Sequence, residues 1–450
     1  MTLTRLVVND LVANRSIWVG ALVVSAAAAA ALSVAAALID TSLGLDLTVA
    51  AALAVLASAA VVLTVVATVV VLSSVTQLTV ALQRRSYALW QLVGVPAQSV
   101  TAVVRVQLAV VALVGAAVGT AVAGPFVPAF LRFGLSEATG LRHLDERFRP
   151  VTAAVVVAVV TTVVVLSGLG ASRRAGRVRA VEVLRDPAQG RGRMTWGRWA
   201  VAAASLSIAV ALTWTLGSGG VRGGSQVLLI GPLSTATAAA VGPAWFPAVL
   251  RMWTSLLPAH LSASWFLARN AAAHQATRST ATISALVVTI ALPGSLYAGF
   301  STFGHAAAAA TGHEPGSLAP STFLLLLGGA LTVSLSGGAA TVLMATQTRE
   351  QESALVQAAG GTRATVLARA LWESLVLVGT AALVAAVVLI WTGCSAALSL
   401  SRATPTAPGF GAGPAAAATA VCTLVLVTVS VLPVLAALRR PVRAVLADGV

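Results

Sequence analysis

The chain has 450 residues, of which 58% are hydrophobic and 9% charged, with a mean hydropathy of +0.94 and a formal net charge of +15. A soluble protein carries about 25% charged residues, so this composition excludes an ordinary soluble domain and predicts an all-α polytopic membrane protein. All 28 basic residues are arginines. Because a Walker A phosphate loop requires lysine, the chain cannot bind ATP through such a loop. The arginines lie beside apolar stretches, which indicates membrane orientation and not nucleic-acid binding.

The first 17 residues predict a short helix in the membrane interface, followed by a span. A cleaved signal peptide is the alternative interpretation. We favour an uncleaved span, because the lead is long and residues 18–39 can cross a bilayer of about 30 Å. About ten spans are expected, at 18–39, 49–75, 102–124, 151–171, 197–216, 226–250, 280–301, 319–346, 367–393 and 414–438.

The distribution of arginine predicts the orientation of these spans. With the N-terminus in the cytoplasm, 22 arginines fall on the cytoplasmic side and six outside. The segment 125–149 is the exception, with four arginines outside that three acidic residues nearly balance. The bias towards the inside predicts that both termini are cytoplasmic.

Two segments between spans, Arg84–Gln107 and Arg349–Ser374, resemble one another when Gly94 is aligned with Gly360, 266 residues further on. The alignment pairs identical residues at five further positions, which are Ala88-Leu89 with Ala354-Leu355, Gln91 with Gln357, Val100 with Val366 and Ala102 with Ala368. An internal repeat with this separation predicts duplicated halves.

Each copy predicts a short amphipathic helix, a turn and a new helix. The amphipathic helices are expected at Gln77–Val93 and Thr348–Ala359. A glycine with positive φ would end each helix, and Pro96 or Thr362 would start the next one.

The repeat extends to whole groups of spans and predicts three domains. Residues 1–187 and 258–450 would each form a four-span repeat, and residues 188–257 a linker with an added two-span hairpin. Both repeats begin on the same side of the membrane because two spans separate them, so they are expected to be parallel.

The second segment resembles the motif of the FtsX-like permease family, the membrane subunits of MacB- and LolC-type ABC transporters. The residues at matching positions are Arg349, Glu352, Gly360, Thr362 and Glu373. The first copy keeps Gly94 but has Ser86 and Gln107 in place of the two acids. Both copies have glutamine, Gln91 and Gln357, where the family often has a basic residue.

The resemblance implies a permease in the bacterial cytoplasmic membrane that docks two copies of a separate ABC ATPase, which would hold the ATP and Mg²⁺. The residues expected to contact the ATPase are Arg84, Arg85, Tyr87, Leu89, Gly94, Arg349, Glu350, Glu352, Leu355, Gly360 and Thr362. The family's exporters of lipoproteins and toxins carry a large extracellular domain, but the outer loops here are short. The expected cargo is therefore a hydrophobic or amphipathic lipid, peptide or drug that enters from the bilayer or the inner cavity.

Plainer interpretations stay open. The two amphipathic segments could be solvated loops, and Glu373 could reach the interface or pair with Arg369. Gly115 and Gly119 fit close helix packing. No metal site is expected from His305, His313 and Glu314, which lack ligand spacing, nor from the two cysteines, Cys394 and Cys422.

Two other functions compete with the permease. The chain has no convincing catalytic arrangement of its own, so an enzyme is not expected. An ATPase-driven regulator that activates an extracellular partner would use the segment 125–149. A secondary transporter would need ionisable groups in mid-membrane, and the expected spans have almost no acids there.

Overall fold

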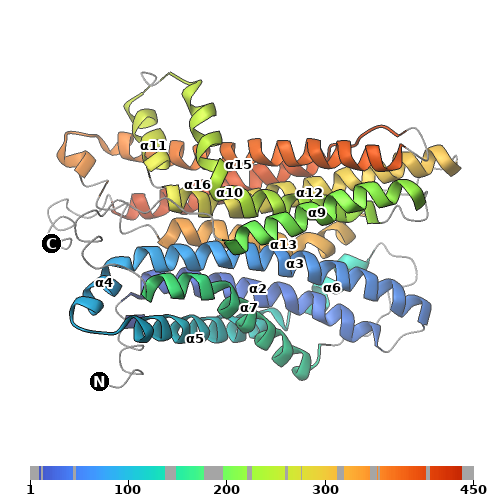
Figure 1. The fold of residues 1–450 in the computed structure, drawn as a ribbon, viewed down its shortest axis with the longest axis horizontal. Helices are drawn as coiled ribbons and strands as arrows, with labels where there is room; N and C mark the ends of the chain where they lie inside the picture. The colour runs from blue at the N-terminus through green and yellow to red at the C-terminus, as the bar shows by residue number, and fades with distance from the viewer. Residues whose placement is uncertain are drawn as a thin grey trace. The chain divides into compact units, whose positions relative to one another are not determined.

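The computed structural model describes residues 10–11, 14–43, 47–136, 148–176, 196–219, 226–258, 262–274, 276–311, 319–344, 352, 355–401 and 406–437. Within these ranges every regular element is helical (Figure 1). Ten helices in the described part are long and apolar enough to cross a membrane. The all-α class and the expected number of spans are thereby confirmed, and they indicate a multi-pass membrane protein.

The helices form two compact units. Unit 1 comprises Met1–Gln189 with Leu318–Met344, and unit 2 comprises Gly190–Ser317 with Ala345–Val450. The helices of unit 1 are α2 (Arg15–Ser42), α3 (Leu47–Leu82), α4 (Arg84–Leu92), α5 (Ala97–Ala123), α6 (Val127–Leu135), α7 (Pro150–Gly176) and α13 (Pro320–Met344). Those of unit 2 are α9 (Trp196–Gly219), α10 (Ile230–Ser255), α11 (Ala263–His274), α12 (Ala276–Thr311), α15 (Arg363–Leu400) and α16 (Ala412–Ala437).

In unit 1 the helices α2, α5 and α7 pack against one another, and glycines set how closely they approach. A Cβ atom at Gly115 would lie 2.8 Å from the carbonyl oxygen of Leu22, and one at Gly119 would overlap the backbone of Ala26. Only glycine fits at these two places, so α5 and α2 meet backbone to backbone, as in other membrane helix pairs with small residues four apart.

Helix α13 belongs to unit 1 although it follows α12 in the chain. It packs against α2 and α3, where a Cβ atom at Gly329 would lie 2.5 Å from Oγ1 of Thr64 and one at Gly337 would overlap Val71. These contacts come from glycines on α13, which let its backbone approach α3. The compact units therefore divide the chain differently from the domains expected at 1–187, 188–257 and 258–450.

In unit 2 the helices α12, α15 and α16 pack against one another, as α2, α5 and α7 do in unit 1. Helix α10 lies against α12 and α15, and α9 lies against α10 and α15. Helices α9 and α10 thus complete this unit. The repeat assigns neither of them to a four-span group.

Proline opens a gap in the hydrogen bonds of α10, and an arginine from α9 fills it. Pro243 has no N–H, so the carbonyl of Ala239 loses its usual partner four residues on. The guanidinium of Arg198 donates to that carbonyl through Nη2 and to the carbonyl of Ala240 through Nε, both at 3.1 Å. This contact holds α9 to the interrupted part of α10.

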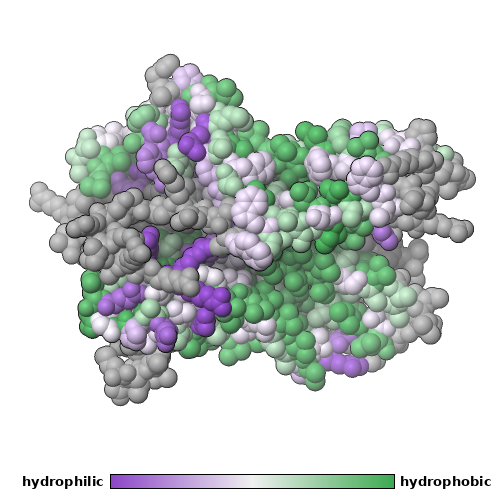
Figure 2. All heavy atoms as spheres, in the orientation of Figure 1, coloured by the Kyte–Doolittle hydropathy of each residue, from purple (hydrophilic) through white to green (hydrophobic). Residues whose placement is uncertain are grey.

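Several helix boundaries differ from the expected ones. Helix α3 continues to Leu82, so the amphipathic helix expected at Gln77–Val93 is in fact the short α4, separated from α3 by Gln83. Helix α6 lies within the segment expected to be an outer loop. Figure 2 shows a largely hydrophobic flank over the helices of unit 1, with hydrophilic residues towards its ends, as lipid contact requires.

Candidate functional site: the two turns between spans

The first turn joins α4 to α5 and contains a glycine with φ of +95°, Gly94. The N–H of Gly94 donates to Gln91 O at 3.1 Å, and the N–H of Val95 donates to Trp90 O at 3.0 Å. These two bonds define a Schellman motif, which satisfies carbonyls that a helix end would leave free. Pro96 then caps the start of α5 with extended backbone, ψ 146°.

The second turn precedes α15 and has the same geometry around Gly360, whose φ is +92°. The N–H of Gly360 donates to Gln357 O at 3.0 Å, and the N–H of Gly361 donates to Val356 O at 2.9 Å. Thr362 caps α15, because its hydroxyl accepts the N–H of Thr365 at 3.2 Å.

The hydrogen bonds of the two turns therefore coincide residue by residue when the chain is shifted by 266 positions. Of the described residues, three have positive φ, all of them glycines, and two are Gly94 and Gly360. The expectation of a positive-φ glycine at both places is confirmed. The aligned pair of segments is thus similar in backbone geometry as well as in sequence.

Both turns present an exposed leucine from equivalent positions. Leu89 on α4 is 47% exposed and Leu355 is 60% exposed. Each lies five residues before the glycine of its turn. An apolar side chain held at the same place on two similar turns is a feature that a partner protein can recognise twice.

Tyr87 was expected to face a partner, but it is fully buried. Its hydroxyl donates to Oε1 of Gln83, and its ring meets that of Trp90 edge to face with centroids 5.6 Å apart. Tyr87 therefore fixes α4 to the unit and is not part of the exposed surface.

A buried polar cluster connects the residues before α2 to α5. The carboxylate of Asp10 accepts hydrogen bonds from Nε2 of Gln107 on α5, at 2.8 Å, and from Nδ2 of Asn14, at 2.9 Å. Burial raises the pKa of Asp10 while these two hydrogen bonds oppose the rise. Burial, and secondarily the charge of Asp10, raises the pKa of Tyr87 well above its usual range. Asp10 before α2, Tyr87 on α4 and Gln107 on α5 thus share one electrostatic environment. The sequence pattern does not indicate it.

The first turn is also tied to the end of α7. Nε2 of Gln91 donates to Gly176 O at 3.2 Å, and Nε of Arg105 donates to Oγ of Ser172 at 3.3 Å. The glutamine at the position where the resembled family has a basic residue therefore binds the carbonyl end of a helix. Gln107, which replaces the second acid of the motif, binds Asp10 in the cluster.

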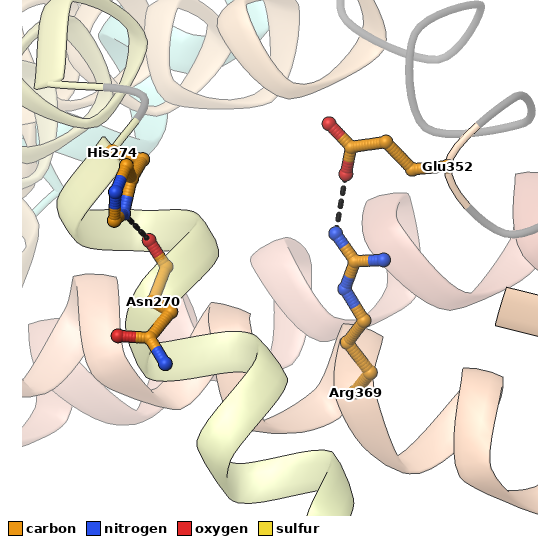
Figure 3. Close-up of polar contacts among 4 residues, drawn as sticks. All are labelled: Asn270, His274, Glu352 and Arg369. Carbon is orange, nitrogen blue, oxygen red and sulfur yellow. Dashed lines mark hydrogen bonds and ion pairs between the residues drawn. The ribbon is translucent and has the colours of Figure 1, made fainter. Parts of the chain in front are cut away.

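The second turn is tied to α15 by an ion pair between Glu352 and Arg369 (Figure 3). Arg369, which the sequence offered as a partner for Glu373, forms this ion pair with Glu352. The side chain of Glu373 is buried on α15. In the same view, Nδ1 of His274 lies 3.0 Å from the carbonyl of Asn270 on α11.

Not all the expected contact residues fall in the described part. Arg349 and Glu350 lie outside it, and so does the side chain of Arg85. Arg84 is half-buried at the start of α4, and Gly94, Gly360 and Thr362 are exposed. Of the residues expected to contact an ATPase, the described part therefore offers the two turns, their exposed leucines and the ion pair of Glu352.

Metal-ligating groups are not brought together in the described residues. Nδ1 of His305 lies 3.3 Å from the carbonyl of Ala407, and His313 and Glu314 lie outside the described residues. Cys394 and Cys422 are free thiols, the first exposed and the second buried.

No protein-family model, curated protein or solved structure matches the chain.

Proposed function

We propose that this chain is the membrane-spanning permease subunit of an ABC transporter. A separate ATPase, in two copies, would bind the two turns and drive the export or extraction of a hydrophobic or amphipathic substrate. The resemblance to the FtsX-like permease family suggests this role. The observation that carries it is the geometric identity of the turns around Gly94 and Gly360, each with an exposed leucine.

The number of candidate spans supports a position of both turns on the same side of the membrane. The first turn follows the second candidate span, and the second turn follows the eighth. Six spans lie between them, and an even number returns the chain to the same side. Two copies of one partner in one compartment would therefore engage both turns, and the arginine distribution supports the cytoplasm as that compartment.

The sequence excludes a Walker A phosphate loop for ATP in the chain itself. A phosphate loop needs a lysine, and the chain has none, so ATP would be bound and hydrolysed by the partner. The purified chain is expected to hydrolyse no ATP unless an ATPase subunit is added.

Photocrosslinking tests the docking of a shared partner. A photoreactive amino acid in place of Leu89 or Leu355 should, in the native membrane, crosslink to the same protein, and that protein should contain a Walker A loop. The same group at Leu113, an exposed residue of α5 within a candidate span, is the matched control and should give no such adduct. Adducts of the two turns with unrelated proteins, or none, would refute the proposal.

Topology and transport are tested separately. A cysteine at Leu355 should react only with a reagent in the cytoplasm, and one at Leu43 only with a reagent outside. The complex reconstituted in vesicles should move a fluorescent lipid or amphipathic peptide when ATP and Mg²⁺ are supplied. ATP turnover without movement of any such cargo would instead favour a regulator.

A further inference from the structure

The last turns of α10 and the helix α11 form a hairpin that stands out from the side of unit 2. In Figure 1 this yellow-green segment rises from the helices at the upper left of the view. It begins near Pro243 and Pro247, the two prolines within α10, and ends at His274. A helix pair that leaves its bundle exposes surface that the bundle does not cover.

Three tryptophans fix the base of this hairpin to α15. Trp265 of α11 is buried between Trp253 of α10, with centroids 6.4 Å apart, and Trp372 of α15, at 5.3 Å. Nε1 of Trp253 also donates to Oγ1 of Thr380 at 2.9 Å. The hairpin therefore has a fixed base on α15, and it lies on the part of α15 that follows the second turn.

The exposed surface of the hairpin combines apolar and basic residues. Met252 is 66% and Leu256 81% exposed, and Phe266 on α11 is exposed as well. Arg251, beside Met252, is also exposed, and the half-buried Arg269 lies one helical turn after both Trp265 and Phe266, on the side of α11 between them. Figure 2 shows hydrophilic residues gathered over this part of the molecule.

No acidic residue occurs between Asp186 and Glu314, whereas seven arginines do. The charge of the hairpin is therefore not neutralised by carboxylates of the same stretch. Arg251 donates through Nε to Pro247 O at 3.0 Å, an intrahelical contact, and makes no ion pair with another described residue. A surface with this charge complements anions, and its exposed apolar residues suit the boundary between headgroups and acyl chains.

We propose that the α10–α11 hairpin binds anionic phospholipids of the inner leaflet. The guanidinium groups of Arg251 and Arg269 contact lipid phosphates, and Met252, Leu256 and Phe266 enter the acyl boundary. The hairpin selects anionic over zwitterionic lipid because each basic residue near a charged membrane surface favours anionic headgroups, by about fivefold. This role does not depend on the proposed transport function.

The test places a fluorophore on the hairpin and measures its contact with each lipid. Leu256→Cys is labelled in a chain that also carries Cys394→Ser and Cys422→Ala, and is reconstituted in nanodiscs. Brominated phosphatidylglycerol or brominated phosphatidylcholine then quenches the fluorophore at the same mole fraction. We expect quenching by the brominated phosphatidylglycerol to be at least about threefold more efficient.

The matched variants separate a binding surface from general attraction. Arg251→Gln with Arg269→Gln should reduce the ratio to about one, whereas Arg173→Gln, an exposed arginine at the end of α7, should leave it unchanged. Equal quenching in the unmutated chain would overturn the proposal, and so would an equal loss in Arg173→Gln. A label protected from both lipids would show that protein, such as a second copy, covers the hairpin, and would also overturn it.

Discussion

Glu352 and Arg369 form an ion pair across the second turn, from residues 17 apart in the chain. The two side chains are only 29% and 13% exposed, so the pair is partly shielded from water. The corresponding positions of the first copy hold Ser86 and the buried Val103, which cannot form such a pair. The two turns thus have the same backbone but different attachments.

This ion pair makes Glu352 a residue that positions the turn. Arg369→Ala should therefore loosen the turn as much as Glu352→Ala does, while global stability falls by less than about 1 kcal/mol because the pair is near the surface. The measurement is the distance distribution between spin labels at Leu355→Cys and Leu371→Cys, both exposed sites, in a chain without the native cysteines. Each single change should broaden the distribution.

The charge swap Glu352→Arg with Arg369→Glu is the control, and it should restore a narrow distribution. A distribution that stays narrow in both single variants would show that the pair does not hold the turn. Because no basic group stands at position 103, Ser86→Glu should not create an equivalent attachment at the first turn.

Alanine at either positive-φ glycine should destabilise the chain through its backbone alone. A Cβ atom at Gly94 or Gly360 meets nothing within 4 Å, so steric overlap adds no cost. The left-handed conformation costs a residue with a Cβ roughly 1–2 kcal/mol. Gly170→Ala and Gly413→Ala are the controls, since both sites are equally open but helical. Unfolding in detergent should show a loss for the first pair and no loss for the second; equal effects on both pairs would contradict the argument.

The stability of unit 1 should depend on pH through Asp10. Burial raises the pKa of this carboxyl, so the folded chain holds its proton more tightly than the unfolded chain does. The contribution of Asp10 to the free energy of unfolding should therefore fall as pH rises from the unfolded pKa, near 3.8, through the raised folded value. Asp10→Asn should flatten this part of the profile, measured as unfolding midpoints between about pH 4 and 8. A profile that keeps its slope in Asp10→Asn would assign it to other groups.

Arg198 and Pro243 should show strong thermodynamic coupling. Arg198→Met leaves the carbonyls of Ala239 and Ala240 without their donor, which should cost about 1–3 kcal/mol. Pro243→Ala supplies an N–H for Ala239, so the same arginine change should cost less in that background. Pro247→Ala is the control, because its amide would serve a different carbonyl. Additive effects for Arg198 and Pro243 would contradict this account.

Local patterns in the sequence predict much of this fold. The length of the apolar segments predicts the spans; for example, the span expected at residues 151–171 lies within Pro150–Gly176. The need for positive φ at a helix end predicts the glycines of both turns. Helix α6 is not among the expected elements although the sequence indicates it: Val127, Leu131 and Leu135 recur every four residues and are all buried.

Contacts between distant residues could not be predicted in this way. Spacing along a helix favours Glu373 as a partner for Arg369, but it does not indicate the ion pair between Arg369 and Glu352, which are 17 residues apart. The hydrogen bond between Asp10 and Gln107 likewise joins residues 97 apart, and no periodicity encodes it. The place of α13 depends on which helix its glycines fit, which hydropathy does not record.

The membership of α13 in unit 1 has a consequence for biosynthesis. The first four long helices of that unit emerge from the ribosome well before Leu318–Met344, and residues 190–317, which belong to the other unit, are made in between. The faces of α2 and α3 that pack against the glycines of α13 must therefore remain uncovered in the bilayer until the eighth span is inserted. Unit 1 cannot mature as an independent product of the first part of the gene, and translation of the intervening region determines when it is completed.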